Sequence, residues 1–158
     1  MDKITKQQIG NIQATQKKLT HLLQSLASEQ DWQPDPGEWS FRFIAAHLAT
    51  TKKECYKKRV VQSAFGKNPP FESYYNTCRN LSKSELVDSL SKWASTRQEI
   101  IEFVTALLEN KFAFTGTHAA FGTLTIQGIL NFMLNHDQEH IANLEKPITR
   151  YRLLPYGD

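Results

Sequence analysis

The chain has 158 residues, a length that suits a single domain spanning residues 1–158. Apolar residues make up 40% and charged residues 22%, which are ordinary proportions for a soluble globular protein. The net charge of +3 gives no reason to expect nucleic acid or an anionic membrane as a partner. Two cysteines without a C-x-x-C pair, Cys55 and Cys78, exclude a disulfide framework and a zinc ribbon.

The sequence predicts neither a secretion signal nor a membrane span. The first eight residues contain no apolar signal core. The longest apolar stretch, Ile100 to Leu108, is too short to span a bilayer and includes Glu102. We therefore predict a cytoplasmic protein.

The first predicted helix runs from Lys3 to Ser28. Its apolar residues recur every three or four positions, which is the period of one helix face. They are Ile9, Ile12, Leu19, Leu22, Leu23 and Leu26. The stretch from Asp31 to Gly37 contains two prolines and ends the helix.

The second predicted helix runs from Ser40, a good N-cap residue, to Phe65. Trp39 and Ile44 flank the cap at the spacing of a hydrophobic staple. A glycine and two prolines follow and end the helix.

The third predicted helix begins at Ser82, which forms an S-x-x-E capping box with Glu85, while Leu81 and Leu86 supply the staple. Its apolar stripe alternates steps of four and three, as in bundles with a left-handed crossing. The stripe consists of Leu86, Leu90, Trp93, Ile100, Val104 and Leu107.

The fourth predicted helix runs from Thr125 to about Leu144 and stops before Pro147. We expect the tail from Arg150 to Asp158 to be irregular and to pack back on the bundle. No run of alternating apolar and polar residues predicts a strand.

Helices without strands predict an all-α fold, a four-helix bundle. About sixteen residues separate the second helix from the third. This length allows one crossover connection in place of a tight antiparallel turn.

Three histidines are candidate metal ligands. His136 and His140 share one face of the fourth helix, with Cβ atoms roughly 5–6 Å apart, although such pairs also occur on ordinary surfaces. His47 lies on the inward face of the second helix, where a lone histidine is more often a core residue than a ligand. Together the three would offer three nitrogens and leave an open coordination position, the pattern of catalytic zinc.

Three segments around these histidines follow a family pattern. Residues 38–48 (EWSFRFIAAHL) contain W-S and H-L, residues 118–125 (HAAFGTLT) match H-x-x-[FY]-G-x-L-T, and residues 135–141 (NHDQEHI) match x-H-D-x-x-H-[LI]. In this order they resemble the DinB-like superfamily, the DinB and YfiT-like group of metal-dependent enzymes. The resemblance covers nearly the whole chain.

The resemblance implies a four-helix bundle with a crossover and a metal triad made of His47, His136 and His140. It also implies one divalent ion, usually zinc or nickel, and a homodimer. Some relatives are transferases that use a low-molecular-weight thiol such as bacillithiol or mycothiol, and others are described as hydrolases. The resemblance thus implies a site without naming a substrate.

Two acidic residues are further candidates for the pocket. Asp137 could accept a hydrogen bond from His47 or His136, or it could be a surface acid. Glu54 could act as a general base, but a salt bridge to Lys58, four residues on, is the favoured prediction.

Two basic residues are also candidates. Arg97 lies at the centre of the third helix's apolar stripe, so it either anchors a substrate carboxylate or Glu54, or extends its head to solvent. His118 either lines the pocket mouth or is an ordinary loop histidine. Nothing near Cys55 or Cys78 predicts a lowered thiol pKa.

The sequence therefore predicts a metal-dependent enzyme, either a hydrolase or a thiol-dependent transferase, that acts on a small molecule. The alternative is a metal-binding stress-response protein without turnover, which a fourth protein ligand such as His118 would favour. A nucleic-acid binder has the least support, because the basic residues of the second helix spread around it and Glu54 interrupts them.

Overall fold

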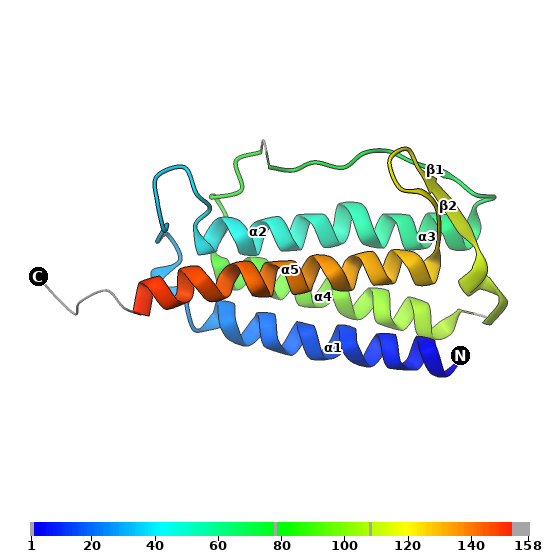
Figure 1. The fold of residues 1–158 in the computed structure, drawn as a ribbon, viewed down its shortest axis with the longest axis horizontal. Coiled ribbons are helices and arrows are strands. Elements are labelled where there is room, and N and C mark those ends of the chain that lie inside the picture. Colours follow the sequence, from blue (N-terminus) through cyan, green and yellow to red (C-terminus); the bar gives the residue numbers. More distant parts are fainter. Residues whose placement is uncertain (1, 78, 108, 153–158) are drawn as a thin grey trace, which may run out of the picture.

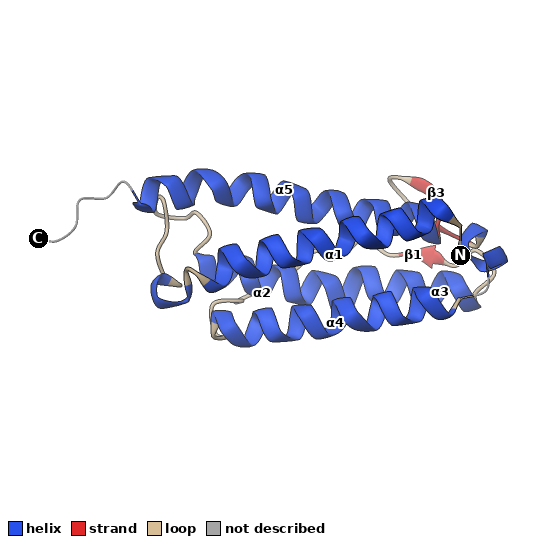
Figure 2. Cartoon of the chain, turned by 90° about the horizontal axis from the view of Figure 1, so that it is seen from below, coloured by secondary structure: helices blue, strands red, loops and turns tan. Residues whose placement is uncertain are grey.

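The structure is a computed structural model that describes residues 2–77, 79–107 and 109–152. In these residues four long helical rods lie side by side, and a small sheet covers one end of the bundle (Figure 1, Figure 2). The predicted all-α four-helix bundle is confirmed, since the sheet is minor. No helix in the described ranges is long and apolar enough to cross a bilayer.

The first rod is α1 (Lys3–Gln24), which is followed by a short 3-10 turn, η1 (Ala27–Glu29). The Asp2 side chain caps α1, because it accepts a hydrogen bond from the Thr5 amide at 2.6 Å. The regular helix ends before the predicted boundary at Ser28.

The second rod consists of α2 (Phe41–Thr51), a π-helical segment η2 (Lys52–Lys57) and α3 (Lys58–Phe65) in direct succession. Ser40 caps it as predicted, since its hydroxyl accepts a hydrogen bond from the Phe43 amide at 3.2 Å. Single π turns inside α-helices are frequent at functional sites. This one begins at a lysine whose side chain is fully buried.

After α3 the chain returns along the bundle before the third rod, α4 (Leu86–Ala106), begins. Figure 1 shows this connection as a trace that runs outside α2 and α3, and it includes strand β1 (Pro70–Phe71). The second and third rods consequently point in the same direction, so the predicted crossover connection is present.

The start of α4 differs from the prediction. Glu85 occupies the N-cap position without a capping bond from its side chain, and the Leu86 amide donates to Oε1 of Gln30 at 2.8 Å. The Glu85 carboxylate pairs with Arg42 at 2.9 Å. The capping box of Ser82 and Glu85 is wrong, because groups from elsewhere in the chain cap the helix and bind the carboxylate.

The fourth rod is α5 (Ile126–Arg152), and it is longer than predicted. It starts as expected after Thr125, whose hydroxyl accepts a hydrogen bond from the Gly128 amide at 3.0 Å. The predicted stop before Pro147 is wrong, since the helix continues through that proline.

Tertiary contacts explain why α5 continues, although an interior proline costs about 3 kcal/mol. Ile148 is buried in the bundle, and Arg150 pairs with Asp35 at 3.0 Å. The Tyr151 ring lies edge-on to Trp32 at 5.5 Å between ring centroids. The predicted irregular tail therefore begins in a helix, and its remainder, residues 153–158, lies outside the described residues.

The small sheet was not predicted. Strands β2 (Thr115–His118) and β3 (Gly122–Thr125) form a hairpin, and β1 pairs in parallel with β2. A short 3-10 helix, η3 (Glu109–Ala113), precedes it. These strands are too short to show an alternating pattern. Gly116 lets the Phe71 ring lie against β2, because any Cβ there would collide with that ring.

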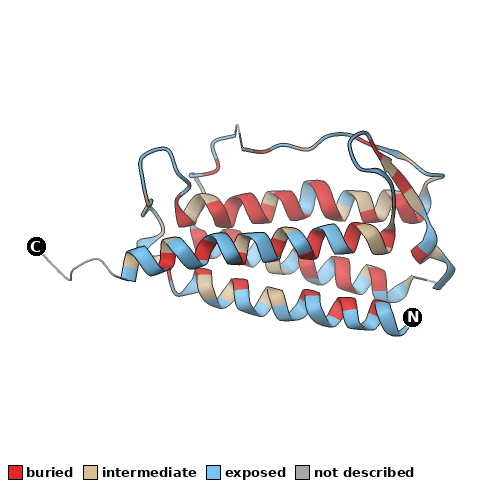
Figure 3. Ribbon diagram, in the orientation of Figure 1, coloured by how far each residue is buried: buried red, intermediate tan, exposed pale blue. Residues whose placement is uncertain are grey.

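Two apolar clusters fill the bundle, one toward the sheet and one toward the opposite end. The first includes Ile12, Tyr56, Ile100 and Met133, and the second includes Leu19, Ala49, Trp93 and Ile141. Figure 3 shows that buried residues line the inward faces of the rods. Between the two clusters, three rods carry the fully buried charged residues Lys52, Arg97 and Asp137.

Candidate metal centre

Three imidazoles from two rods converge on one point. His47 comes from α2, whereas His136 and His140 lie one turn apart on α5. One nitrogen of each ring lies within 4.8 Å of the others, and the Nε2 atoms of His136 and His140 are 3.2 Å apart. The 3.2 Å separation of these two Nε2 atoms is compatible with two zinc–nitrogen bonds of about 2.0–2.1 Å.

The surroundings keep these imidazoles neutral. Burial, followed by the neighbouring His140 and Lys52, lowers the pKa of His136 to about 2. Burial and His47 lower the pKa of His140 to about 4. The pKa of His47 is also lowered by burial. Neutral imidazoles present free lone pairs, so the donor set suits a divalent metal ion.

Asn76, from the crossover connection, fixes the ring of His47. Its Oδ1 lies 2.6 Å from Nδ1 of His47. The amide nitrogen of Asn76 donates to the hydroxyls of Thr50 at 2.6 Å and Thr51 at 3.0 Å, which settles which end of the amide faces the imidazole. His47 therefore donates from Nδ1, and its Nε2 lone pair is available to an ion.

Asp137 lies on the other side of the cluster and is fully buried, so it is not a surface acid. Its Oδ1 is 4.0 Å from Nδ1 of His136, and that nitrogen has no hydrogen-bond partner among the described residues. Lys52 donates to the same carboxylate at 2.9 Å, and Arg97 donates to its other oxygen. Among the described residues, Asp137 is thus the carboxylate that lies near the second nitrogen of His136.

Arg97 occupies neither of the positions predicted for it. It is fully buried, with its guanidinium bound to Asp137 and to the carbonyl of Ile12 at 3.1 Å. It therefore reaches neither Glu54 nor solvent, and a substrate cannot touch it. Lys52 completes the buried group, and burial, with Arg97 nearby, lowers its pKa to about 7.

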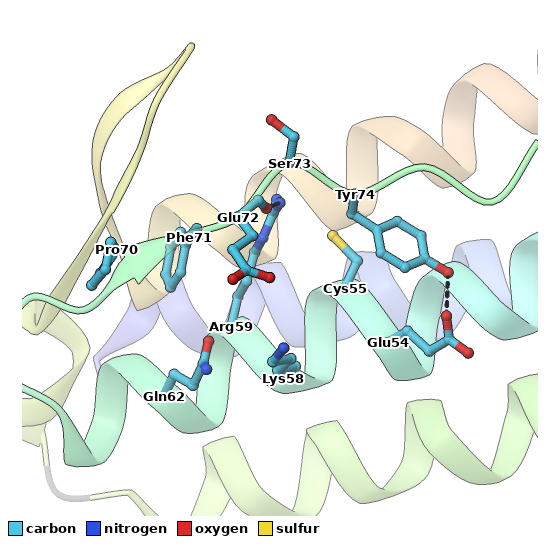
Figure 4. Close-up of a pocket in the computed structure, with 10 residues that line it drawn as sticks. All are labelled: Glu54, Cys55, Lys58, Arg59, Gln62, Pro70, Phe71, Glu72, Ser73 and Tyr74. Atoms are coloured by element: carbon cyan, nitrogen blue, oxygen red, sulfur yellow. Dashed lines mark hydrogen bonds between the residues drawn. The ribbon is translucent and has the colours of Figure 1, made fainter.

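Glu54 faces the crossover connection rather than the predicted Lys58. It pairs with Arg79 at 2.6 Å and accepts a hydrogen bond from the Tyr74 hydroxyl at 2.8 Å (Figure 4). Because Tyr74 also accepts from Asn76 at 3.2 Å, Glu54 is linked to His47 through two intervening side chains. The predicted salt bridge to Lys58 is wrong, and the carboxylate is committed to this network.

His118 ends β2 and lines the cavity beside the histidine cluster. Its Nδ1 accepts hydrogen bonds from the amides of Ala120 at 3.0 Å and Phe121 at 3.3 Å. The cavity measures about 360 Å³ and is also lined by His47 and His136. His118 does not belong to the group that could hold a metal ion in the described part of the chain.

The structure describes one of the two cysteines, Cys55. Cys55 is buried beside this cavity, and burial raises the pKa of its thiol, in agreement with the absence of any sequence feature that would lower it. Cys78 lies outside the described residues.

The family model of the DinB superfamily matches residues 11–144, which include all three histidines. The chain belongs to the DinB superfamily. The resemblance read from the sequence is confirmed. No curated protein sequence matches the chain.

The fold of this DinB-superfamily chain is similar to a solved structure, YfiT from Bacillus subtilis. The TM-score is 0.81, the match covers 96% of this chain and 90% of that chain, and the sequence identity is 18%. YfiT is described as a probable metal-dependent hydrolase with an unusual four-helix bundle topology. At this identity the likeness establishes a shared fold.

Sequence reasoning missed two residues that shape the site of this DinB-superfamily chain, Asn76 and Lys52. Asn76 lies in a connection without periodicity, so no local pattern indicated its contact with His47. Lys52 is one of several basic residues that spread around the second predicted helix, and the period of that helix changes at the π segment, so helical spacing alone does not mark Lys52 as buried. The position of Lys52 among the inward-facing apolar residues of its helix was the signal that could have indicated its burial.

Proposed function

We propose that this chain is a metal-dependent enzyme, a hydrolase that acts on a small molecule. The observation that carries the proposal is the convergence of three neutral imidazoles from two helices beside a cavity of about 360 Å³. The description of YfiT as a probable metal-dependent hydrolase supports the same reaction class.

In this proposal His47, His136 and His140 bind one divalent ion, with zinc or nickel as the expected metal. Such an ion supplies a Lewis acid that polarises a substrate oxygen. Asn76 holds the ring of His47, and the Asp137 carboxylate attracts the N–H of His136. His118 and the other cavity residues orient the substrate.

The described residues offer three ligands and no fourth, because His118 stays outside the ligand group. Three protein ligands leave a position for substrate, which favours an enzyme over a metal-binding stress-response protein without turnover. The same position would accept a thiolate, so a transferase that uses a low-molecular-weight thiol is the second candidate. The homodimer expected from the family resemblance remains a prediction.

Metal analysis of protein purified without added metal tests the site. We expect about one zinc or nickel ion per chain, and its loss in His47→Ala, because two imidazoles on one helix hold an ion weakly. His21→Ala is the matched control, since His21 is exposed on α1. Unchanged metal content in a folded His47→Ala variant would refute the ligand assignment.

Activity measurements separate the two reaction classes. The metal-loaded protein is assayed against a panel of amides and esters, and then against an electrophile with bacillithiol. A hydrolase cleaves members of the first panel and loses this activity when a chelator removes the ion. Thiol adduct formation without hydrolysis would support the transferase instead.

A further inference from the structure

Arg59 is a half-buried arginine that pairs with no carboxylate in the described part of the chain. Arg42, Arg79, Arg97 and Arg150 each pair with a carboxylate. Within the described residues, the guanidinium of Arg59 makes one hydrogen bond, to the carbonyl of Glu72 at 2.9 Å, and lies over the Phe71 ring. A guanidinium has five N–H donors, so most of its capacity is unused.

The unused donors border the candidate metal centre. Arg59 lines the cavity of about 360 Å³ that His47 and His136 also line. A second cavity of about 380 Å³ shares Arg59 and His136 with it. Arg59 and the histidine cluster are thus accessible from the same two hollows.

Arg59 borders the same cavity as the first histidine. His47, Thr51, Cys55 and Arg59 follow one another at steps of four along the second rod, and all four line the first cavity. Because the π-helical segment η2 lies between them and rises less per residue than the 1.5 Å of an α-helix, the Cα atoms of His47 and Arg59 lie less than about 18 Å apart along the axis. Because both side chains line one cavity, a small molecule that fills it would contact both.

The local charge favours an anion. No aspartate or glutamate lines the first cavity, and the acid that lines the second, Glu139, is exposed. Beneath the histidines, Lys52 and Arg97 share the single carboxylate of Asp137. Glu54 and Glu72 border Arg59 in a separate cavity, so the absence of acids among the described residues applies to the cavity that Arg59 shares with His47 and His136.

The cavity walls suit an apolar body between two polar ends. Tyr56 and Phe121 line both hollows, and the Phe121 ring lies 5.1 Å from that of Phe132. Arginine is well suited to binding a carboxylate or another oxyanion through paired N–H donors. Since no described carboxylate pairs with Arg59, its guanidinium is available to an anionic ligand in these cavities.

We propose that Arg59 determines substrate specificity by binding an anionic group, such as a carboxylate, on a substrate whose other end reaches the histidine cluster. This inference rests on the proposed function for the end of the substrate that reacts at the histidine cluster. It adds that the small-molecule substrate is an acid with a mainly apolar spacer. Arg59 acts on the far end of that substrate, away from the ion.

The test uses straight-chain mercaptocarboxylates of five to eight carbons and the matching mercaptoalcohols as probes. The thiolate binds the metal, and only the acids offer a charge to Arg59. In the zinc-loaded protein we expect an acid to bind about ten-fold tighter than its alcohol at one length or more. Calorimetry gives both dissociation constants.

Arg59→Gln should bring the acid-to-alcohol ratio close to one without changing zinc content or the affinity for the alcohol. Arg59→Lys should keep part of the preference, because it keeps the charge. Lys58→Gln is the matched control, since it removes an exposed charge one residue away and should keep the full preference. A preference that survives in Arg59→Gln, or falls equally in Lys58→Gln, would overturn the inference.

The same ratio is measured in the metal-free protein, which separates the two proposals. Contact between the carboxylate and Arg59 needs no metal, so an Arg59-dependent preference for the acid should persist there. If the protein binds no zinc but keeps this preference, the proposed function fails and the inference stands. If the wild-type ratio is close to one in both states, the inference is wrong.

Discussion

Asn76 determines which nitrogen of His47 is free to bind an ion. The amide is held from both ends, since its oxygen faces the imidazole and its nitrogen donates to Thr50 and Thr51. A side chain fixed in this way imposes one tautomer on the histidine. The crossover connection thus contributes to the site without supplying a ligand.

Asn76→Ala should weaken metal binding by about 10- to 100-fold, the usual effect of losing a partner of a metal-bound histidine. Competition with a coloured chelator measures the affinity. Nitrogen NMR of the metal-free protein should show His47 moving from one tautomer to a mixture, a change that loss of stability alone would not cause. Asn11→Ala, on the exposed face of α1, is the control and should alter neither quantity. A single unchanged tautomer in Asn76→Ala would contradict the role assigned to Asn76.

At the scale of the helices, the buried ion cluster joins all four rods. Asp137 comes from α5, Arg97 from α4 and Lys52 from the second rod, while Arg97 also donates to the carbonyl of Ile12 on α1. The cluster separates the two apolar halves of the core. Buried charges are tolerated only when each has a partner, so the two cations depend on one carboxylate.

Asp137→Asn should destabilise the fold by about 3–5 kcal/mol, because it leaves two buried cations without a counter-charge. Urea unfolding followed by circular dichroism measures the loss. Asp35→Asn removes an exposed pair with Arg150 and should cost at most about 1 kcal/mol. Equal losses in the two variants would show that the buried cluster contributes no special stability.

Helix periodicity predicts the rods well, because each buries one apolar face. The predicted starts after Ser40 and Thr125 are confirmed, since local side-chain caps define them. The wrongly predicted boundaries are those that depend on residues far away in the sequence. Gln30 caps the start of α4, and the burial of Ile148 stabilises α5 beyond its proline. Local sequence patterns cannot predict such long-range contacts.

In the candidate site, too, features set by local spacing were predictable and features set by long-range contacts were not. The spacing of His136 and His140 places both on one face, and the inward position of His47 adds a third nitrogen. The partners of Arg97 and Glu54 were wrong, because Asp137 and Arg79 lie far away in the sequence and meet them only in the folded bundle. Ligand spacing within a helix is local information, whereas pairing between rods depends on the tertiary structure.

At the scale of the whole molecule, the candidate metal centre connects two rods that are distant in the chain. His47 belongs to α2 and the other two histidines belong to α5, so one ion bound by all three would cross-link them. The crossover connection contacts the same centre, because the Asn76 side chain is hydrogen-bonded to His47. Metal occupancy and the stability of the bundle would therefore be coupled if the three histidines bind one ion.

Zinc should raise the melting temperature of the wild-type protein with increasing concentration, because an ion that binds only the folded state stabilises it. The gain is about 4 kcal/mol when free zinc exceeds the dissociation constant a thousand-fold. Calorimetric scans should show this shift for wild type and His21→Ala and little shift for His47→Ala, which lacks the link from α2 to α5. An equal shift in His47→Ala would mean that zinc stabilises the bundle from another place, and the three histidines would then not form a shared site.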